Sequence, residues 1–328
     1  MRPSISDDLL AVVLNEYPLG GPRVVALMEA SVRNESFLVE DASGRRYVLR
    51  RYRRNPDERR VRFQLAFQQQ LHHLGYPTSE IILSNAGDLF VAGQGGPCVL
   101  FTFVDGEEYD FSRMGQAAEA GRRLAEFHTI TAAIELEEVV LDINVRVRNW
   151  WSRGDEELAA LEALYRDDGV EEEMAYLRSW HGALLRAWPL DRLEALPQGW
   201  VHSDFHGRNM VFGGDELRGL FDFDPLHRGF FVEDVAHALF MFSRERRGSM
   251  RIRPDVARVF LDGYTSVRGL SDEERASLPM MNVLAWAPIA PYQKLQRRDG
   301  EDDLAWFRHY VELMRALEGE GERLRPLL

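Results

Sequence analysis

The sequence GWVHSDFHGRNMVFGGDELRGLFDFD occupies residues 199–224, and the rest of the chain is interpreted from it. Its pattern predicts a short strand over residues 200–202 that enters a loop. Two further strands are expected over residues 209–212 and 217–223, and a turn at residues 213–216 joins them into a hairpin. The stretch therefore predicts strand ends that meet at one place.

Three polar residues fall at these strand ends. Asp204 and Asn209 lie on one loop with four residues between them, and Asp222 returns to the same place after the hairpin. Phosphoryl transfer to a hydroxyl needs a carboxylate that accepts a proton and hard oxygen ligands that hold a divalent cation. We therefore predict that Asp204 is the catalytic base and that Asn209 and Asp222 bind Mg²⁺. A lone aspartate in a loop is more often a turn or cap residue, but the strand framing and the presence of all three residues favour the catalytic interpretation.

The composition is typical of a globular protein with room for two domains. The chain has 328 residues, of which 45% are hydrophobic and 28% charged, and these values are ordinary for such proteins. The net charge of −13 at pH 7 argues against a general nucleic-acid-binding protein, which would present a basic face. The single cysteine, Cys98, excludes an internal disulfide bond and fits a reducing compartment. We expect Cys98 to be a buried small hydrophobic residue rather than a reactive thiol.

No targeting segment or membrane span is expected. The first residues lack a basic segment followed by an apolar run, and no window approaches about 18 consecutive apolar residues. We therefore expect a soluble, cytoplasmic protein that binds neither membranes nor nucleic acid. The sequence does not indicate its oligomeric state.

The first hundred residues predict a mixed lobe built on an antiparallel sheet. Helices are expected over residues 5–16 and 55–74, the second after a helix-start signal at Asn55 and Pro56. Strands are expected over residues 24–29, 36–39, 47–52, 81–83, 89–92 and 98–104.

After residue 104 the pattern becomes mainly helical. Helices are expected over residues 114–129, 148–165, 171–188, 233–242, 254–267, 273–289 and 304–317, with a break near Pro279. The chain is therefore expected to divide into a mixed α+β lobe over residues 1–104 and a mainly helical lobe over residues 105–328.

Several motifs resemble those of the aminoglycoside phosphotransferase and choline kinase family. His202–Asn209 (HSDFHGRN) and Phe221–Asp224 (FDFD) are similar to its catalytic loop and metal-binding motif. Leu124–His128 (LAEFH) resembles the family's helix that ends in Leu-x-x-x-His, and Glu233–Ala236 (EDVA) resembles the segment after the metal-binding motif. The resemblance spans about residues 25–245.

This resemblance implies a bilobal protein-kinase-like fold, with an N-terminal nucleotide-binding lobe and a C-terminal catalytic and substrate lobe. It implies an enzyme that transfers the γ-phosphate of ATP, or alternatively of GTP, to a small-molecule hydroxyl acceptor, with Mg²⁺ as cofactor. The acceptor would be an amino alcohol, an amino sugar, an aminoglycoside or a homoserine-like compound. The nucleotide-binding residues would be Asn34 and Ser36 in the covering turn at residues 33–36, and Phe101 and Phe103 in the interlobe hinge.

One departure from the family pattern concerns the nucleotide phosphates. The family commonly has a lysine on the third strand, paired with a helix glutamate, but Lys294 is the only lysine of this chain. Arg50 stands in the lysine's place, and Gln64 falls near the expected glutamate. Arginine can contact phosphate through two N–H groups but is not equivalent to lysine. We therefore expect Arg50 to be either a phosphate ligand or an exposed strand residue.

Neighbouring residues are assigned supporting roles. His202 is expected to position the loop from a buried site, and Asp234 to brace it by accepting hydrogen bonds. His128 is expected to be a packed core histidine. Asp224 is expected to be a strand-end carboxylate rather than a second metal ligand, and the role of His206 stays open.

Other functions are compatible with parts of the sequence. His202, Asp204 and His206 form an H-x-D-x-H pattern that could be the metal site of a hydrolase, although no second cluster of such ligands accompanies it. The missing strand lysine suggests a nucleotide-binding pseudokinase. A bacterial stress-response Ser/Thr kinase is a further alternative, although no Ala-Pro-Glu segment follows Asp222. The acidic residues of the second lobe hint at a cationic acceptor.

Overall fold

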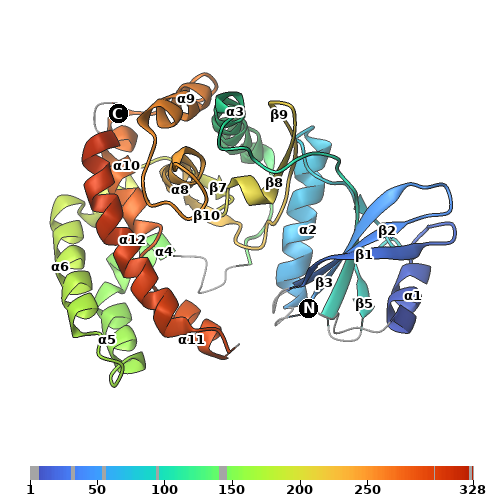
Figure 1. Ribbon diagram of the computed structural model, residues 1–328, viewed down its shortest axis with the longest axis horizontal. Helices are drawn as coiled ribbons and strands as arrows, with labels where there is room; N and C mark the ends of the chain where they lie inside the picture. Colours follow the sequence, from blue (N-terminus) through green and yellow to red (C-terminus); the bar gives the residue numbers. More distant parts are fainter. Residues whose placement is uncertain are drawn as a thin grey trace.

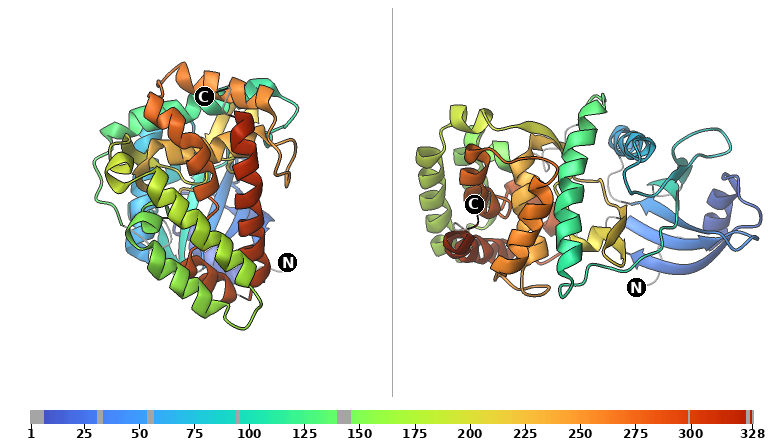
Figure 2. Two further views of the ribbon diagram at one scale, coloured as in Figure 1. Left: turned by 90° about the vertical axis from the view of Figure 1, so that its left-hand side faces the viewer. Right: turned by 90° about the horizontal axis from the view of Figure 1, so that it is seen from above.

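The computed structural model describes residues 7–30, 34–53, 57–93, 96–139, 146–298, 300–324 and 327 of the chain. Two regions lie side by side (Figure 1): one contains the main sheet with α1 and α2, and the larger one is made mainly of helices. Seen from above, α3 (Met114–Ile130) lies between the sheet and the remaining helices (Figure 2). The predicted α+β class, with an antiparallel sheet followed by a helical region, is confirmed.

The main sheet has six strands, and every pairing in it is antiparallel. Its order is β1–β2–β3–β6–β4, and β5 also pairs with β6. The strands are β1 (Arg23–Ala30), β2 (Asn34–Glu40), β3 (Arg46–Tyr52), β4 (Ile81–Ile82), β5 (Val91–Gly93) and β6 (Gly96–Thr102). Each expected strand is present, with ends that differ by at most two residues. Buried and half-buried side chains alternate along β2, because successive side chains of a strand point to opposite faces.

One small core lies on each face of this sheet. On one face, α1 (Asp7–Asn15) packs side chains such as Leu10 and Val13 against the strands. Cys98 is fully buried in this core, as the sequence predicted. The opposite face is covered by α2 (Glu58–His73) through side chains such as Leu65.

The helix α2 also joins the two regions. It begins after Asp57, whose side chain accepts a hydrogen bond from the backbone N–H of Arg59 and so caps the helix. Phe63 and Phe67 of α2 belong to the largest core, which extends through the helical region. Their ring centroids lie 5.6 and 5.2 Å from that of the buried Trp200.

The helical region is built around a close pair formed by α3 and α9. Gly121 and Gly263 allow this approach, because a Cβ on either would lie 2.0 or 2.1 Å from a backbone oxygen of the other helix. The other helices are α4 (Arg146–Ser152), α5 (Gly154–Leu164), α6 (Glu171–Ala187), α7 (Leu190–Glu194), α8 (Phe231–Ser243), α9 (Pro254–Thr265), α10 (Asp272–Leu284), α11 (Ala290–Arg298) and α12 (Asp303–Leu324). Among the described residues, no helix is long and apolar enough to cross a membrane.

Two helix predictions were wrong. The helix expected over residues 148–165 is two helices, because His181 Nε2 bonds the carbonyl of Trp150 (2.8 Å) and packs against Gly154, which an unbroken helix would use instead. Pro279 lies inside α10 rather than breaking it, and the flanking side chain of Leu278 is buried there. The helix expected over residues 273–289 ends at Leu284, and α11 is separate.

Two hairpin-like pairs carry the candidate site. β7 (Gln198–Val201) pairs with β10 (His227–Phe230), a strand that was not predicted, and β8 (Met210–Gly213) pairs with β9 (Glu216–Leu220). The last of these strands ends at Leu220 rather than at residue 223, since Asp222 has a φ of 63° and leaves the extended conformation. Asn209 lies in a short 3₁₀ turn rather than in a strand.

Candidate active site

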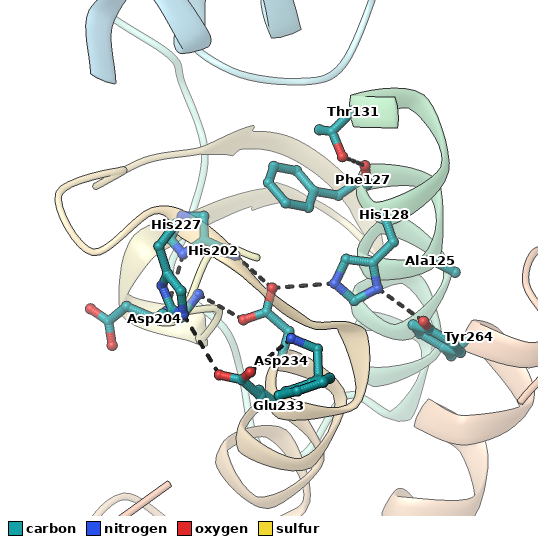
Figure 3. A network of polar contacts seen from close by, with 12 residues as sticks. Ala125, Phe127, His128, Thr131, His202, Asp204, His227, Glu233, Asp234 and Tyr264 are labelled. Atoms are coloured by element: carbon teal, nitrogen blue, oxygen red, sulfur yellow. Dashed lines mark hydrogen bonds and ion pairs between the residues drawn. The ribbon is translucent and has the colours of Figure 1, made fainter. Parts of the chain in front are cut away.

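Asp234 holds the predicted catalytic loop. It is buried in the first turn of α8, and its carboxylate accepts hydrogen bonds from the backbone N–H groups of His202 (2.6 Å) and Ser203 (2.7 Å), as Figure 3 shows. His128 of α3 lies between this carboxylate (3.2 Å) and the hydroxyl of Tyr264 (2.9 Å). Burial opposes ionisation, but the hydrogen bond and attraction to His128 keep the pKa of Asp234 below its ordinary value. The geometry agrees with the predicted bracing role.

His202 ties the loop to the second motif. Its Nδ1 accepts a hydrogen bond from the backbone N–H of Asp204 (3.3 Å), and its Nε2 lies 3.1 Å from the carbonyl oxygen of Phe221. Because Nδ1 accepts, Nε2 carries the proton of the neutral ring and donates it to that carbonyl. Burial lowers the pKa of His202, so the ring is neutral at pH 7. It therefore positions the loop, as predicted.

Asp204 is a half-exposed, ionised carboxylate. Its Oδ1 lies 3.1 Å from His206 Nε2 and 3.9 Å from His237 Nε2. Burial alone would raise the pKa of Asp204, but the hydrogen bond and attraction to His206, together with the effect of His237 and His202, hold it well below its ordinary value. Asp204 can therefore accept a hydrogen bond from a hydroxyl at neutral pH.

Asn209 lies directly beside Asp204. Its Nδ2 donates to the backbone carbonyl (3.0 Å) and to the carboxylate (2.8 Å) of Asp204. Its own carbonyl oxygen accepts a hydrogen bond from the backbone N–H of Phe221 (2.8 Å), the residue before Asp222. The side-chain oxygen, Oδ1, makes no hydrogen bond with any described residue. An unpaired amide oxygen next to a carboxylate suits a magnesium ion.

Arg50 of β3 reaches across to the second motif. Its guanidinium donates hydrogen bonds to Asp222 (2.9 Å) and Asp224 (3.1 Å). Only 17% of its side chain is exposed, so the alternative prediction of an exposed strand residue is wrong. Burial would lower the pKa of Arg50, but attraction to Asp224 and Asp222 raises it. Its Nε is buried and makes no hydrogen bond with any described residue, which leaves a donor for a further anion.

Asp224 is more than a strand-end carboxylate, because the strand already ends at Leu220. Its side chain accepts a hydrogen bond from Asn34 Nδ2 of β2 (3.1 Å) as well as from Arg50. Burial and the neighbouring Asp222 raise the pKa of Asp224, and Arg50 opposes this rise. Asp224 thus connects the sheet to the site.

Two side chains of α2 hold the same segment through its backbone. Gln64, expected near the position of the family glutamate, donates to the carbonyl of Asp224 (2.9 Å). Arg60 donates to the carbonyls of Asp224 (2.8 Å), Leu226 (2.5 Å) and Val139 (2.7 Å). Arg60 was not predicted from the sequence. The only signal for it is its helical spacing from the buried face of α2, at four residues before Gln64.

The other predicted nucleotide-binding residues lie around this junction. Asn34 and Ser36 are both on β2, and Ser36 is the register partner of Arg50. Phe101 is buried in the core between the sheet and α2. Phe103 follows β6, with the guanidinium of Arg46 4.4 Å from its ring centroid. Residue 33 of the predicted covering turn lies outside the described residues, and the nucleotide contacts of the other four stay predictions.

The alternative hydrolase site does not form. Both ring nitrogens of His202 are engaged in hydrogen bonds within the loop, so His202 cannot share a metal ion with Asp204 and His206. Within the part of the chain that the structure describes, no group of three or more His, Cys, Asp or Glu residues is placed to hold a metal ion.

Sequence comparison identifies clear relatives. The model of the phosphotransferase enzyme family matches residues 25–270. The homoserine kinase of Rhizobium etli is 30% identical over 277 residues, which cover 84% of this chain and 82% of that protein. The homoserine kinase of Phenylobacterium zucineum is 27% identical over 277 residues, with 84% and 81% covered.

Solved structures share the fold. A microcompartment-associated aminopropanol kinase superposes with a TM-score of 0.69 at 17% identity, covering 97% of this chain and 96% of that one. Amicoumacin kinase in complex with AMP-PNP, Ca²⁺ and Ami gives a TM-score of 0.68 at 17% identity, with 94% and 93% covered. At this identity the likeness concerns the fold alone, and it confirms the predicted protein-kinase-like architecture.

Proposed function

Because this chain belongs to the phosphotransferase enzyme family and is a small-molecule kinase, we propose that it transfers the γ-phosphate of Mg²⁺-bound ATP to an alcohol. The observation that carries this proposal is the direct contact between Asp204 and Asn209 (2.8 Å), beside the segment of Asp222. A pseudokinase would have no need to keep a base and two metal ligands in one constellation.

The residues present fit a nucleotide with its metal ion. Asn209 Oδ1 and the Asp222 carboxylate are the hard oxygen ligands that Mg²⁺ prefers. The bound ion would neutralise negative charge on the phosphates. Arg50, with its buried and unpartnered Nε, would contact the phosphates. Asn34, Ser36, Phe101 and Phe103 would complete the nucleotide site.

Asp204 would act on the acceptor. Its lowered pKa keeps it ionised at neutral pH, so it can orient the acceptor hydroxyl through a hydrogen bond. As the hydroxyl oxygen bonds to the γ-phosphorus, Asp204 would take the hydroxyl proton. His206 and the Asn209 amide would hold the carboxylate in place.

Homoserine is the acceptor that we propose first. The support is the similarity to homoserine kinases over more than four fifths of the chain. The earlier hint of a cationic acceptor loses its basis, because acidic side chains on the helices are paired with arginines rather than gathered at the site. Such pairs are Glu162–Arg178, Glu172–Arg315, Glu173–Arg308 and Asp303–Arg297.

The test measures ADP formation with MgATP and L-homoserine. Asp204→Asn should lower kcat by about 10²–10⁴-fold, the usual contribution of a general base, without a change in melting temperature. Asp215→Asn is the matched control, since Asp215 lies in the exposed turn between β8 and β9 and pairs only with Arg113. Near-normal turnover by the Asp204 variant would refute the assignment of the base.

A further inference from the structure

A second feature lies immediately beside the predicted base. A recess of about 30 Å³ opens next to the catalytic loop. It is lined by Glu108, Tyr109 and Phe111 before α3, by His206, Gly207 and Arg208 of the loop, and by Met241, Arg244 and Arg247 at the end of α8. His206 belongs both to this lining and to the 3.1 Å contact with Asp204. Anything bound in the recess is therefore a neighbour of the base.

The recess carries uncompensated positive charge. Its lining has three arginines and one glutamate, a formal net charge of +2 with histidine neutral. Arg208, Arg244 and Arg247 make no ion pair and no side-chain hydrogen bond with any described residue, and Arg244 only approaches the ring of Phe111 (5.8 Å). By contrast Arg253, a few residues further on, pairs with Asp255 at 2.8 Å. Three guanidinium groups without a partner form a binding site for an anion.

Arg244 shows the consequence of this crowding. Its Nε is buried and has no hydrogen-bond partner among the described residues, although such donors are normally satisfied. Burial, and then repulsion from Arg247 and Arg208, lower the pKa of Arg244. A bound anion would satisfy the donor and relieve the repulsion. The small volume suits the terminal carboxylate of a ligand rather than its whole body, because a single water occupies about 30 Å³ in the liquid.

We propose that this arginine recess binds a carboxylate of the acceptor, so that the substrate is a hydroxy acid of the amino-acid type. The proposal rests on the proposed function, because it takes Asp204 as the base that the acceptor hydroxyl approaches. Glu108, the acidic member of the lining, makes no printed ion pair with the arginines and is available to the ammonium group of such a zwitterion. The recess thus selects the acceptor by charge, while Asp204 acts on its hydroxyl.

The experiment compares two acceptors that differ only in charge, L-homoserine and L-homoserinamide. The enzymes are wild type, Arg244→Gln, Arg247→Gln and Arg246→Gln. The last is the matched control, because Arg246 is an exposed arginine of the same loop that does not line the recess. We expect wild type to prefer the acid, and kcat/KM for the acid to fall about tenfold or more in the Arg244 and Arg247 variants. Turnover of the amide, and both activities of the Arg246 variant, should stay unchanged.

Several results would overturn the proposal. They are equal use of acid and amide by wild type, an equal loss for both acceptors in the variants, or better turnover of an acceptor without a carboxylate, such as 1-amino-2-propanol or an aminoglycoside. Arg247 is exposed, so its variant should fold even if that of Arg244 does not.

If no acceptor is turned over, the proposed function fails separately, and calorimetric binding of L-homoserine with MgADP present decides the inference. Binding that is weakened in the Arg247 variant but not in the Arg246 variant supports it. Binding that is absent, or equal in both variants, overturns it.

Discussion

Ser203 and Asp222 both have a φ of 63°, in the left-handed region that non-glycine residues rarely adopt. Such a conformation costs about 1–2 kcal/mol per residue. Asp234 holds Ser203 through its backbone N–H, and Arg50 holds Asp222 through its carboxylate. The strain is therefore located where the chain turns out of two strands to bring the catalytic and metal-binding side chains together.

Two buried histidines near this loop are perturbed in opposite directions. Burial lowers the pKa of His128 despite its contact with Asp234. For His227 of β10, burial has the opposite sign from the dominant effect, and the hydrogen bond and attraction to Glu233 raise its pKa. Figure 3 shows both rings beside the first turn of α8.

These shifts predict opposite pH dependences of stability. With a lowered pKa, His128 is protonated more readily in the unfolded chain, so the stability it supports is complete above about pH 6.5 and is lost as the pH falls below that value. With a raised pKa, His227 supports stability that is complete below about pH 6.5 and is lost as the pH rises through its folded pKa. Urea unfolding from pH 5.5 to 7.5 should therefore show that His128→Asn becomes more costly with rising pH and His227→Asn less costly. Parallel curves for the two variants would contradict these assignments.

At the scale of elements, α2 is the part of the sheet-containing region that fixes the metal-binding segment. Its Phe63 and Phe67 pack into the large core, while Arg60 and Gln64 bind the backbone of residues 224–226. Burial lowers the pKa of Arg60 to about 10, so its guanidinium stays charged at neutral pH. One charged side chain thus satisfies three carbonyl groups that secondary structure leaves unpaired.

Replacing Arg60 should therefore affect both stability and activity. Arg60→Met keeps the length of the side chain but leaves those carbonyls without a donor, and we expect a loss of about 3 kcal/mol or more, since one hydrogen bond to a charged group contributes about 1.5–3 kcal/mol. Turnover should fall as well, because the segment that carries Asp222 loses its fixation. Arg59→Met is the control, since Arg59 is largely exposed and contacts only Asp57. Urea unfolding and ADP formation measure both effects, and equal behaviour of the two variants would refute this role of α2.

The sequence was sufficient for whatever depends on local pattern. Alternation and turn residues predicted the strands of the main sheet, and the spacing of Asp204, Asn209 and Asp222 predicted the site. Interactions between distant segments were not accessible in this way. The break between α4 and α5 comes from His181, twenty-seven residues after Gly154, and the role of Arg60 depends on how α2 docks.

At the scale of the whole molecule, the site lies at the junction of the two regions. Arg50 and Asn34 of the main sheet meet Asp222 and Asp224 of the second motif there. Four hydrogen-bonding side chains from two regions hold the junction without any nucleotide. A ligand that binds there should therefore oppose unfolding of both regions at once.

Nucleotide binding should consequently stabilise the whole chain by linkage. At a concentration of 100 times its dissociation constant, a ligand that binds only the folded state adds about 2.7 kcal/mol, so MgATP should raise the melting temperature by several degrees. Asp222→Ala should abolish the part that requires Mg²⁺, and Arg50→Ala should weaken the shift and raise the Michaelis constant for ATP. Asp204→Asn should keep the full shift although it is inactive, because Asp204 serves the acceptor rather than the nucleotide. Thermal unfolding with ATP, with and without Mg²⁺, measures these shifts, and a full Mg²⁺-dependent shift in the Asp222 variant would exclude Asp222 as a metal ligand.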